Sequence, residues 1–156
     1  MKVLVIRSAP IALFERVLKL ILAEDENAEI SVLSHPSTNG ELLKLHPVEI
    51  YNYSGTAINF FTVRWSVLKA LREKEFDRVI ILYSNILGQG YGAIRQLAFL
   101  LKAKKIESFN PKGKVLELSF IKSLGQYFSE KLSYCLYAGI WGVLFLKKRV
   151  VYANRN

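Results

Sequence analysis

The sequence is poor in the residues that bind metals or form disulfides. Its 156 residues include one cysteine, Cys135, and two histidines, His35 and His46. A single cysteine excludes an internal disulfide, and its distance from the histidines matches no zinc motif. Cys135 lies in an apolar segment, where a free thiol is usually buried and inert. We therefore expect no resident metal and no disulfide framework.

Acidic residues are scarce in one part of the chain only. Residues 1–100 carry 11 Lys and Arg against 10 Asp and Glu, whereas residues 101–156 carry 11 against 3. A nearly neutral first part argues against nucleic-acid binding, although the whole chain has a formal net charge of +9. The basic excess surrounds an apolar C-terminal segment, a pattern that an anionic membrane surface attracts. Lysines that merely solubilise an apolar end are the alternative.

The chain also lacks an apolar run long enough to cross a membrane as a helix. Residues 132–146 carry no charge, but these fifteen residues fall short of the roughly 20 that a helical span needs. An in-plane anchor fits this length, with aromatic residues in the interface and basic residues at the headgroups. The expected membrane contacts are Tyr134, Tyr137, Trp141, Phe145, Lys147, Lys148 and Arg149. Packing against another protein or a second copy is the alternative, because the segment is too apolar all round for a surface helix.

Short apolar runs alternate with amphipathic segments in the first 119 residues. The runs predict strands at 2–6, 29–34, 48–54, 78–84 and 114–119. Apolar residues at helical spacing predict helices within 11–25, 37–47, 58–76 and 91–105. Strands that alternate with helices pair in parallel through right-handed crossovers. The expected fold is therefore α/β: a Rossmann-like open parallel sheet with helices on both faces, followed by a C-terminal amphipathic to apolar helix.

Three regions follow from this pattern. A Rossmann-like half domain occupies residues 1–119, an amphipathic to apolar helical tail occupies 120–149, and a polar terminus occupies 150–156. The first ten residues show no signal-peptide pattern and are typical of a buried strand. Together with the expected anchor, this predicts a cytoplasmic protein that is peripheral to the inner face of the cell membrane.

Candidate ligand-binding residues follow the strands, because open α/β sheets bind ligands at the carboxyl ends of their strands. They are Arg7, Ser8, His35, Asn85, Gly88, Gly90 and Gly92. Arg7 and Ser8 are suited to an anion, and a loop histidine such as His35 is a candidate general base. The sequence shows no Ser-His-Asp order and no closely spaced carboxylate pair. It therefore predicts no catalytic residue.

The three glycines lie in LGQGYGAI, residues 87–94, between a strong strand and a helix. A phosphate-binding loop would occupy this place. The spacing is G-x-G-x-G, however, and not the G-x-G-x-x-G of dinucleotide-binding folds. Glu107, which we expect in a lysine-rich loop after the helix, is not placed to hold a ribose. A turn that lets the helix start close to the sheet is the favoured alternative, and no cofactor is predicted.

Four segments within residues 1–118 form a further pattern: MKVLVIRS, AEISVLSHPSTNGELLKLHP, LREKEFDRVIILYS and AKKIESFN. In this order they resemble the N-terminal half of heptosyltransferase-like glycosyltransferases. The resemblance implies the acceptor-side half of a GT-B architecture. It also implies a role in envelope polysaccharide or lipopolysaccharide assembly, with a sugar or lipid-linked acceptor.

Two departures from this family bear on activity. The first turn of the family carries a Gly-Asp pair with the presumed catalytic base, whereas Ala12 and Leu13 stand at these positions. The half that binds the nucleotide sugar has no counterpart in the chain. The resemblance therefore implies a membrane-associated half domain that binds an acceptor or a catalytic partner subunit and does not transfer sugar alone. The alternative is a non-catalytic Rossmann-like scaffold whose tail forms a homo-oligomer.

Overall fold

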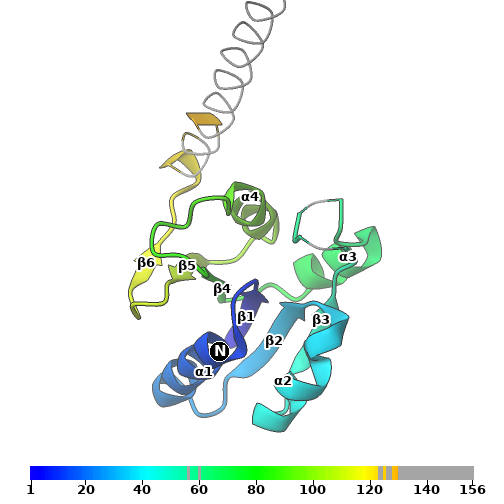
Figure 1. The fold of residues 1–156 in the computed structure, drawn as a ribbon. Coiled ribbons are helices and arrows are strands. Elements are labelled where there is room, and N and C mark those ends of the chain that lie inside the picture. The colour runs from blue at the N-terminus through cyan, green and yellow to red at the C-terminus, as the bar shows by residue number, and fades with distance from the viewer. Residues whose placement is uncertain (56, 60, 123–124, 126–127, 130–156) are drawn as a thin grey trace, which may run out of the picture.

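The structure is a computed structural model that describes residues 1–55, 57–59, 61–122, 125, 128 and 129. These residues form one six-stranded sheet in the order β3-β2-β1-β4-β5-β6 (Figure 1). The strands are β1 Lys2–Arg7, β2 Glu29–Ser34, β3 Glu49–Asn52, β4 Arg78–Leu82, β5 Lys105–Phe109 and β6 Val115–Glu117. The helices are α1 Ile11–Glu24, α2 Asn39–Leu45, α3 Trp65–Glu73 and α4 Gly92–Leu100, with a 3₁₀ turn η1 at Pro36–Thr38.

The strand order makes this an open, doubly wound sheet. Strands β1 to β5 pair in parallel, and the order along the sheet reverses direction between β1 and β4. The prediction of a Rossmann-like α/β fold is thus confirmed for the body. The last strand departs from it, since β6 pairs with β5 antiparallel. The turn at residues 110–113 returns the chain directly, whereas a parallel pair needs a long crossover. Asn110 closes this turn by accepting the N–H groups of Lys112 and Lys114 at 3.1 Å each.

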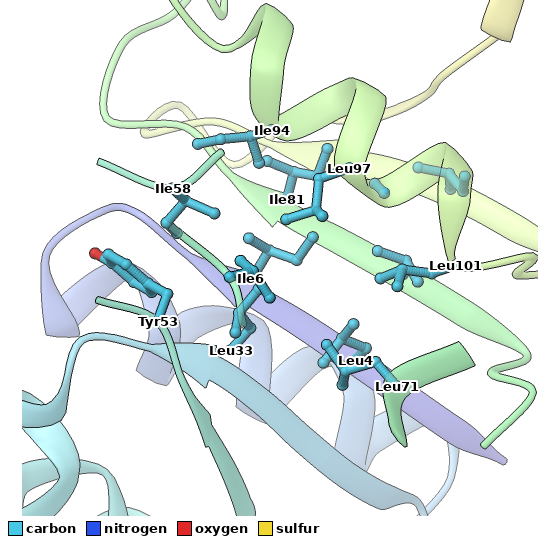
Figure 2. Close-up of a cluster of buried hydrophobic side chains, with 14 of the residues drawn as sticks. Leu4, Ile6, Leu33, Tyr53, Ile58, Leu71, Ile81, Ile94, Leu97 and Leu101 are labelled. Atoms are coloured by element: carbon cyan, nitrogen blue, oxygen red, sulfur yellow. The ribbon is translucent and has the colours of Figure 1, made fainter. Parts of the chain in front are cut away.

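Helices cover both faces of the sheet, because apolar residues of each central strand point alternately to either side. Val3 and Val5 of β1 pack with α1 and with Leu42 of α2, in a cluster that includes Phe14 and Phe109. Leu4 and Ile6 point to the other face. There they join the helices α3 and α4 in a second cluster (Figure 2). A strand that is buried on both faces has a continuous apolar sequence, which is why β1 and β4 could be predicted from the sequence.

The predicted helix over 91–105 is wrong at its C-terminal end. Helix α4 ends at Leu100, Lys102 takes a φ of 54°, and Lys105–Phe109 forms strand β5. Glu107 therefore lies in the sheet and not in a loop. Its neighbours Ile106 and Ser108 are buried as well, so β5 is covered on both faces. The lysines at 102, 104 and 105 obscured the boundary, because they continue the polar face of the helix.

The predicted helix over 58–76 begins later than expected, at Trp65. Asn59 holds the preceding segment in a turn, since its side-chain oxygen accepts the N–H groups of Phe61 and Thr62 at 2.8 and 3.1 Å. Asparagine side chains compete with helical hydrogen bonds in this way. The backbone N–H of Ser54 donates to the Thr62 carbonyl at 2.9 Å and closes the loop. The described residues Tyr53, Ala57 and Ile58 of this segment lie near Arg7, at the carboxyl end of β1.

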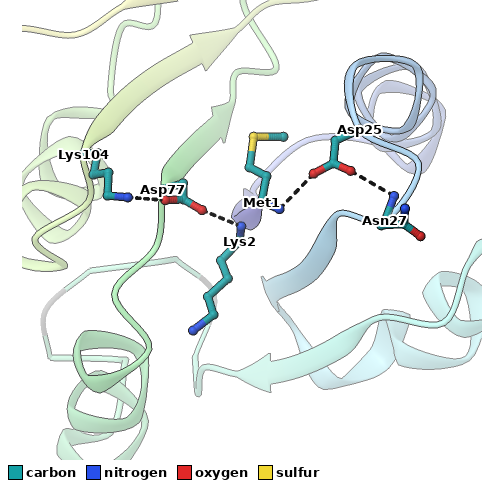
Figure 3. A network of polar contacts seen from close by, with 6 residues as sticks. All are labelled: Met1, Lys2, Asp25, Asn27, Asp77 and Lys104. Carbon is teal, nitrogen blue, oxygen red and sulfur yellow. Dashed lines mark hydrogen bonds and ion pairs between the residues drawn. The ribbon is translucent and has the colours of Figure 1, made fainter.

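Ion pairs and hydrogen bonds join the elements at the N-terminal ends of the strands, which we call the amino edge of the sheet (Figure 3). Asp77 accepts the backbone N–H of Lys2 at 2.8 Å and pairs with the Lys104 ammonium at 2.6 Å. Asp25 pairs with the amine of Met1 at 2.8 Å. Lys104 and the Met1 amine lower the pKa of Asp77 and Asp25, respectively. These carboxylates fix the starts of β1 and β4 and the turn before β5, so the amino edge is occupied by structural contacts.

The helical tail is described only at its start. Phe120–Lys122 have helical backbone and are exposed. The predicted anchor, residues 132–146, and all the expected membrane contacts from Tyr134 to Arg149 lie outside the described residues. Within the part of the chain that the structure describes, no helix is long and apolar enough to cross a membrane.

Candidate functional site

A depression of about 320 Å³ opens at the carboxyl ends of β1 and β4, where the strand order reverses. We call it the switch-point depression. Its described lining residues are Arg7, Ser8, Ala9, Tyr53, Ala57, Ile58, Gly90, Tyr91 and Ile94. Figure 2 shows Tyr53, Ile58 and Ile94 close together at this end of the apolar cluster. Such reversal points are the usual ligand sites of open α/β sheets, because the loops on either side diverge there.

Arg7, the last residue of β1, is the only charged residue among the described lining residues. One terminal nitrogen, Nη1, donates to the Ser34 hydroxyl at 3.3 Å. Its Nε is buried and has no hydrogen-bond partner among the described residues. Burial lowers the pKa of Arg7, while Glu41 and Tyr53 raise it, and an arginine stays charged under these conditions. Arg7 thus brings a positive charge to the depression, and its buried Nε is a donor without a partner among the described residues.

Tyr53 and His35 extend the site toward β2. The backbone N–H of Tyr53 donates to the Ser34 carbonyl at 3.3 Å. Burial raises the pKa of Tyr53, so its hydroxyl remains a neutral donor. The His35 ring contacts the Tyr53 ring edge-on, with centroids 5.7 Å apart. His35 Nδ1 accepts the Ser37 N–H at 3.3 Å, which holds the ring against the η1 turn. His35 contacts the lining residue Tyr53 and is not itself among the described lining residues.

The loop after β4 is shaped by its own polar contacts. The Tyr91 hydroxyl accepts the Ser84 N–H at 2.7 Å and bonds the Ser84 hydroxyl at 2.8 Å. The Asn85 side-chain amide bonds the backbone N–H and C=O of Gln89 at 3.2 and 2.9 Å. Of the predicted residues in this loop, Gly90 lines the depression, whereas Asn85 fixes the loop.

Gly88 and Gly92 also serve the shape of this loop. Gly88 packs on the Tyr83 ring with a φ of 65°, and Gly92 is the buried first residue of α4. Ser8 lines the depression, and its hydroxyl donates to the Leu82 carbonyl at 2.8 Å, which joins β1 to β4. The structure thus brings Arg7, Ser8 and Gly90 together, as the sequence predicts.

Two helices begin at the depression. Helix α1 starts at Ile11, just after the lining residue Ala9, and α4 starts at Gly92, just after Tyr91. The first N–H groups of a helix have no partner within it, and they carry a partial positive charge. None of the described lining residues is acidic. The formal charge among the described lining residues is therefore positive, and an influence of opposite sign on Arg7 comes from Glu41, outside the lining.

The sequence missed the roles of Tyr53, Ile58, Tyr91 and Ile94. Tyr91 lies inside the glycine-rich segment, but the glycine spacing assigns no role to it. Tyr53 and Ile58 belong to a loop that the sequence assigned partly to a strand and partly to a helix. Only the fold places that loop next to β1.

The described residues contain no group of three or more His, Cys, Asp or Glu side chains that fits a metal ion. A larger depression, of about 620 Å³, lies beside α3 and is lined by Trp65, Lys69, Arg72, Glu73, Glu75 and Lys102. It mixes cations and carboxylates, and Lys69 pairs with Glu73 at 3.8 Å across exposed positions. The smaller switch-point depression, with one sign of charge and a buried donor, is the better candidate site.

Comparison with known proteins finds no significant similarity: no protein-family model, no curated protein and no solved structure matches the chain.

Proposed function

We propose that the domain binds a small phosphate-bearing ligand in the switch-point depression. The observation that supports this proposal is Arg7, a cation with a buried and unused Nε, at a place where two helices begin and no acidic side chain is among the described lining residues. Phosphate oxygens fit both the planar donors of arginine and the N–H groups of a helix start. The volume is at the lower end of the range for small-molecule sites.

Binding without catalysis fits the residues around the depression. A transfer reaction needs a base within hydrogen-bond reach of the acceptor. Leu13, which occupies the position of the base in the resembling family, is buried in the cluster beneath α1. We therefore propose an acceptor-side half domain of the glycosyltransferase kind, which acts in envelope polysaccharide or lipopolysaccharide assembly. It holds a sugar or lipid-linked acceptor or joins a catalytic partner subunit.

Arg7→Gln is expected to weaken the binding of glucose 6-phosphate by about tenfold to a hundredfold, since a hydrogen bond to a charged group contributes about 1.5–3 kcal/mol. Isothermal titration calorimetry on the full chain measures this change. Arg7→Lys keeps the charge but loses the fork of donors, so an intermediate affinity is expected.

Arg72→Gln is the matched control for this experiment, because it removes one positive charge from the other depression. Glucose is the ligand control, because it has no phosphate. Equal binding by the Arg7→Gln variant, or equal affinity for glucose, would show that the depression is not a phosphate site.

Membrane association is the second part of the proposal. At the start of the tail, Phe120, Ile121 and Phe128 are exposed apolar side chains. Lys112, Lys114 and Lys122 are exposed nearby in the sequence, so an apolar surface is accompanied by positive charge. This combination favours an anionic bilayer surface.

We expect the full chain to float with anionic vesicles at low salt and to be released at high salt, because surface charges are screened. Ile121→Asp should reduce the floating fraction, since this side chain is 81% exposed and would no longer enter the interface. Leu20→Asp, an exposed position on α1, is the control. A chain that stays in solution as a stable dimer would instead favour the non-catalytic scaffold, with the tail as an interface between copies.

A further inference from the structure

Large apolar side chains are exposed on the two loops that supply lining residues to the switch-point depression, and we call Phe61, Ile86 and Leu87 the apolar rim. Phe61 is 93% exposed, and it belongs to the same loop as the lining residues Ala57 and Ile58. Leu87 is 70% exposed and Ile86 is 48% exposed. Both precede the lining residue Gly90 in the loop after β4. Isolated exposed apolar residues are ordinary, but here three large ones stand on the two loops that border one depression.

The depression itself has a polar part and an apolar part. Arg7, Ser8 and Tyr53 supply the charged and hydroxyl groups, whereas Ile58, Ile94 and the alanines supply apolar surface. Figure 2 shows Ile58 and Ile94 side by side, above the ring of Tyr53. A sugar carries hydroxyl groups around its ring, and burying them against this apolar surface would leave some of them without hydrogen-bond partners.

The rim is held in place by hydrogen bonds from the body. The Asn110 side-chain amide donates to the Ile86 carbonyl at 3.2 Å, which ties this loop to the turn before β6. The Asn85–Gln89 contacts close the same loop around Leu87. The loop of Phe61 is closed by the Ser54–Thr62 and Asn59–Thr62 bonds. Apolar side chains on fixed loops keep their position when a ligand arrives.

We infer that the ligand is amphiphilic: a phosphate monoester of an aliphatic alcohol, with its phosphate at Arg7 and its chain leaving across Ile58 and Ile94 toward the rim. This inference rests on the proposed phosphate site and names the class of its ligand. It favours a lipid-type acceptor over a free sugar or a protein partner. The apolar rim covers the alkyl chain of the ligand, while Arg7 and the N-terminal ends of α1 and α4 bind its charged phosphate.

Titration calorimetry of the full chain with methyl, butyl and hexyl phosphate tests the inference, because these esters dissolve as monomers and differ only in chain length. Each methylene group that becomes buried is expected to tighten binding about fourfold. Hexyl phosphate should therefore bind at least about tenfold more tightly than methyl phosphate, even when only two methylene groups are buried. It should also bind more tightly than glucose 6-phosphate.

Four variants separate the contribution of the ligand's alkyl chain from that of its phosphate. Leu87→Ser and Phe61→Ser should reduce the gain from methyl to hexyl phosphate and leave the affinity for methyl phosphate unchanged. Leu20→Ser, an exposed leucine near the amino edge of the sheet, should leave both unchanged. Arg7→Gln should weaken all three esters by a similar factor.

The two proposals fail in different ways. An affinity that is independent of chain length, or a preference for glucose 6-phosphate over hexyl phosphate, overturns the amphiphilic ligand and leaves the phosphate site standing. A gain with chain length that persists unchanged in both rim variants also overturns it, because the chain would then bind elsewhere. Absence of binding by every ester, or binding that ignores Arg7→Gln, overturns the phosphate site itself.

Discussion

Replacing Glu107 with leucine is expected to lower the free energy of unfolding by about 3 kcal/mol, the typical cost of removing one partner of a buried ion pair. The Glu107 side chain is 4% exposed on β5, and it pairs with Arg78 of β4 and with Lys105 at 2.8 Å. Arg78 is itself only 14% exposed and would keep Glu24, at 2.6 Å, as its acidic partner. Leucine fills a similar volume, so the expected loss of stability comes from the Arg78 guanidinium, whose Nε loses its Glu107 partner.

Urea denaturation of a set of variants checks this expectation. Adding Arg78→Met to Glu107→Leu should recover much of the lost stability, because the double variant also removes the mostly buried guanidinium that has lost its Glu107 partner. Glu73→Gln is the control, since it breaks the exposed Lys69–Glu73 pair, and a change below about 0.5 kcal/mol is expected. A Glu107→Leu variant with an unchanged free energy of unfolding would contradict the position of Glu107 in the sheet.

Gly88→Ala is expected to destabilise the domain by about 2–5 kcal/mol, as the sum of backbone strain and overpacking. Gly88 has a φ of 65°, a conformation that residues with a Cβ rarely adopt. A Cβ at this position would lie 2.4 Å from Cε2 of Tyr83. The Tyr83 ring is buried and packs on the Tyr91 ring at 4.5 Å between centroids, so it has no room to withdraw.

Gly90→Ala separates the two causes. Gly90 also has a positive φ, 81°, but a Cβ there would meet no atom within 4 Å. Strain alone should cost about 1–2 kcal/mol, so the difference between the two variants measures the clash with Tyr83. Thermal unfolding of both variants gives this difference, and Tyr83→Leu in the Gly88→Ala background should recover part of it. Equal stabilities would mean that Tyr83 does not pack against Gly88.

Elements that are buried on both faces or amphipathic could be predicted from local sequence patterns. Strands β1, β2 and β4 and helix α1 are visible because burial imposes a continuous apolar run on a parallel strand and a 3.6-residue period on a helix. The alternation of these elements was also enough to predict parallel pairing. It placed Arg7, Ser8 and Gly90 at carboxyl ends of strands, where the structure shows a depression.

Tertiary contacts decided what local patterns left ambiguous. The segment at Lys105–Phe109 follows a lysine-rich stretch that continues the helical period, and only pairing with β4 and β6 makes it a strand. Glu107 is tolerated inside the sheet because Arg78, distant in sequence, pairs with it there. The site follows the same logic: Tyr53 and Ile58 meet Arg7 only because β3, β2 and β1 are neighbours in the sheet. A propensity or a period describes one segment, whereas a site at the reversal point of a sheet depends on loops that the fold brings together.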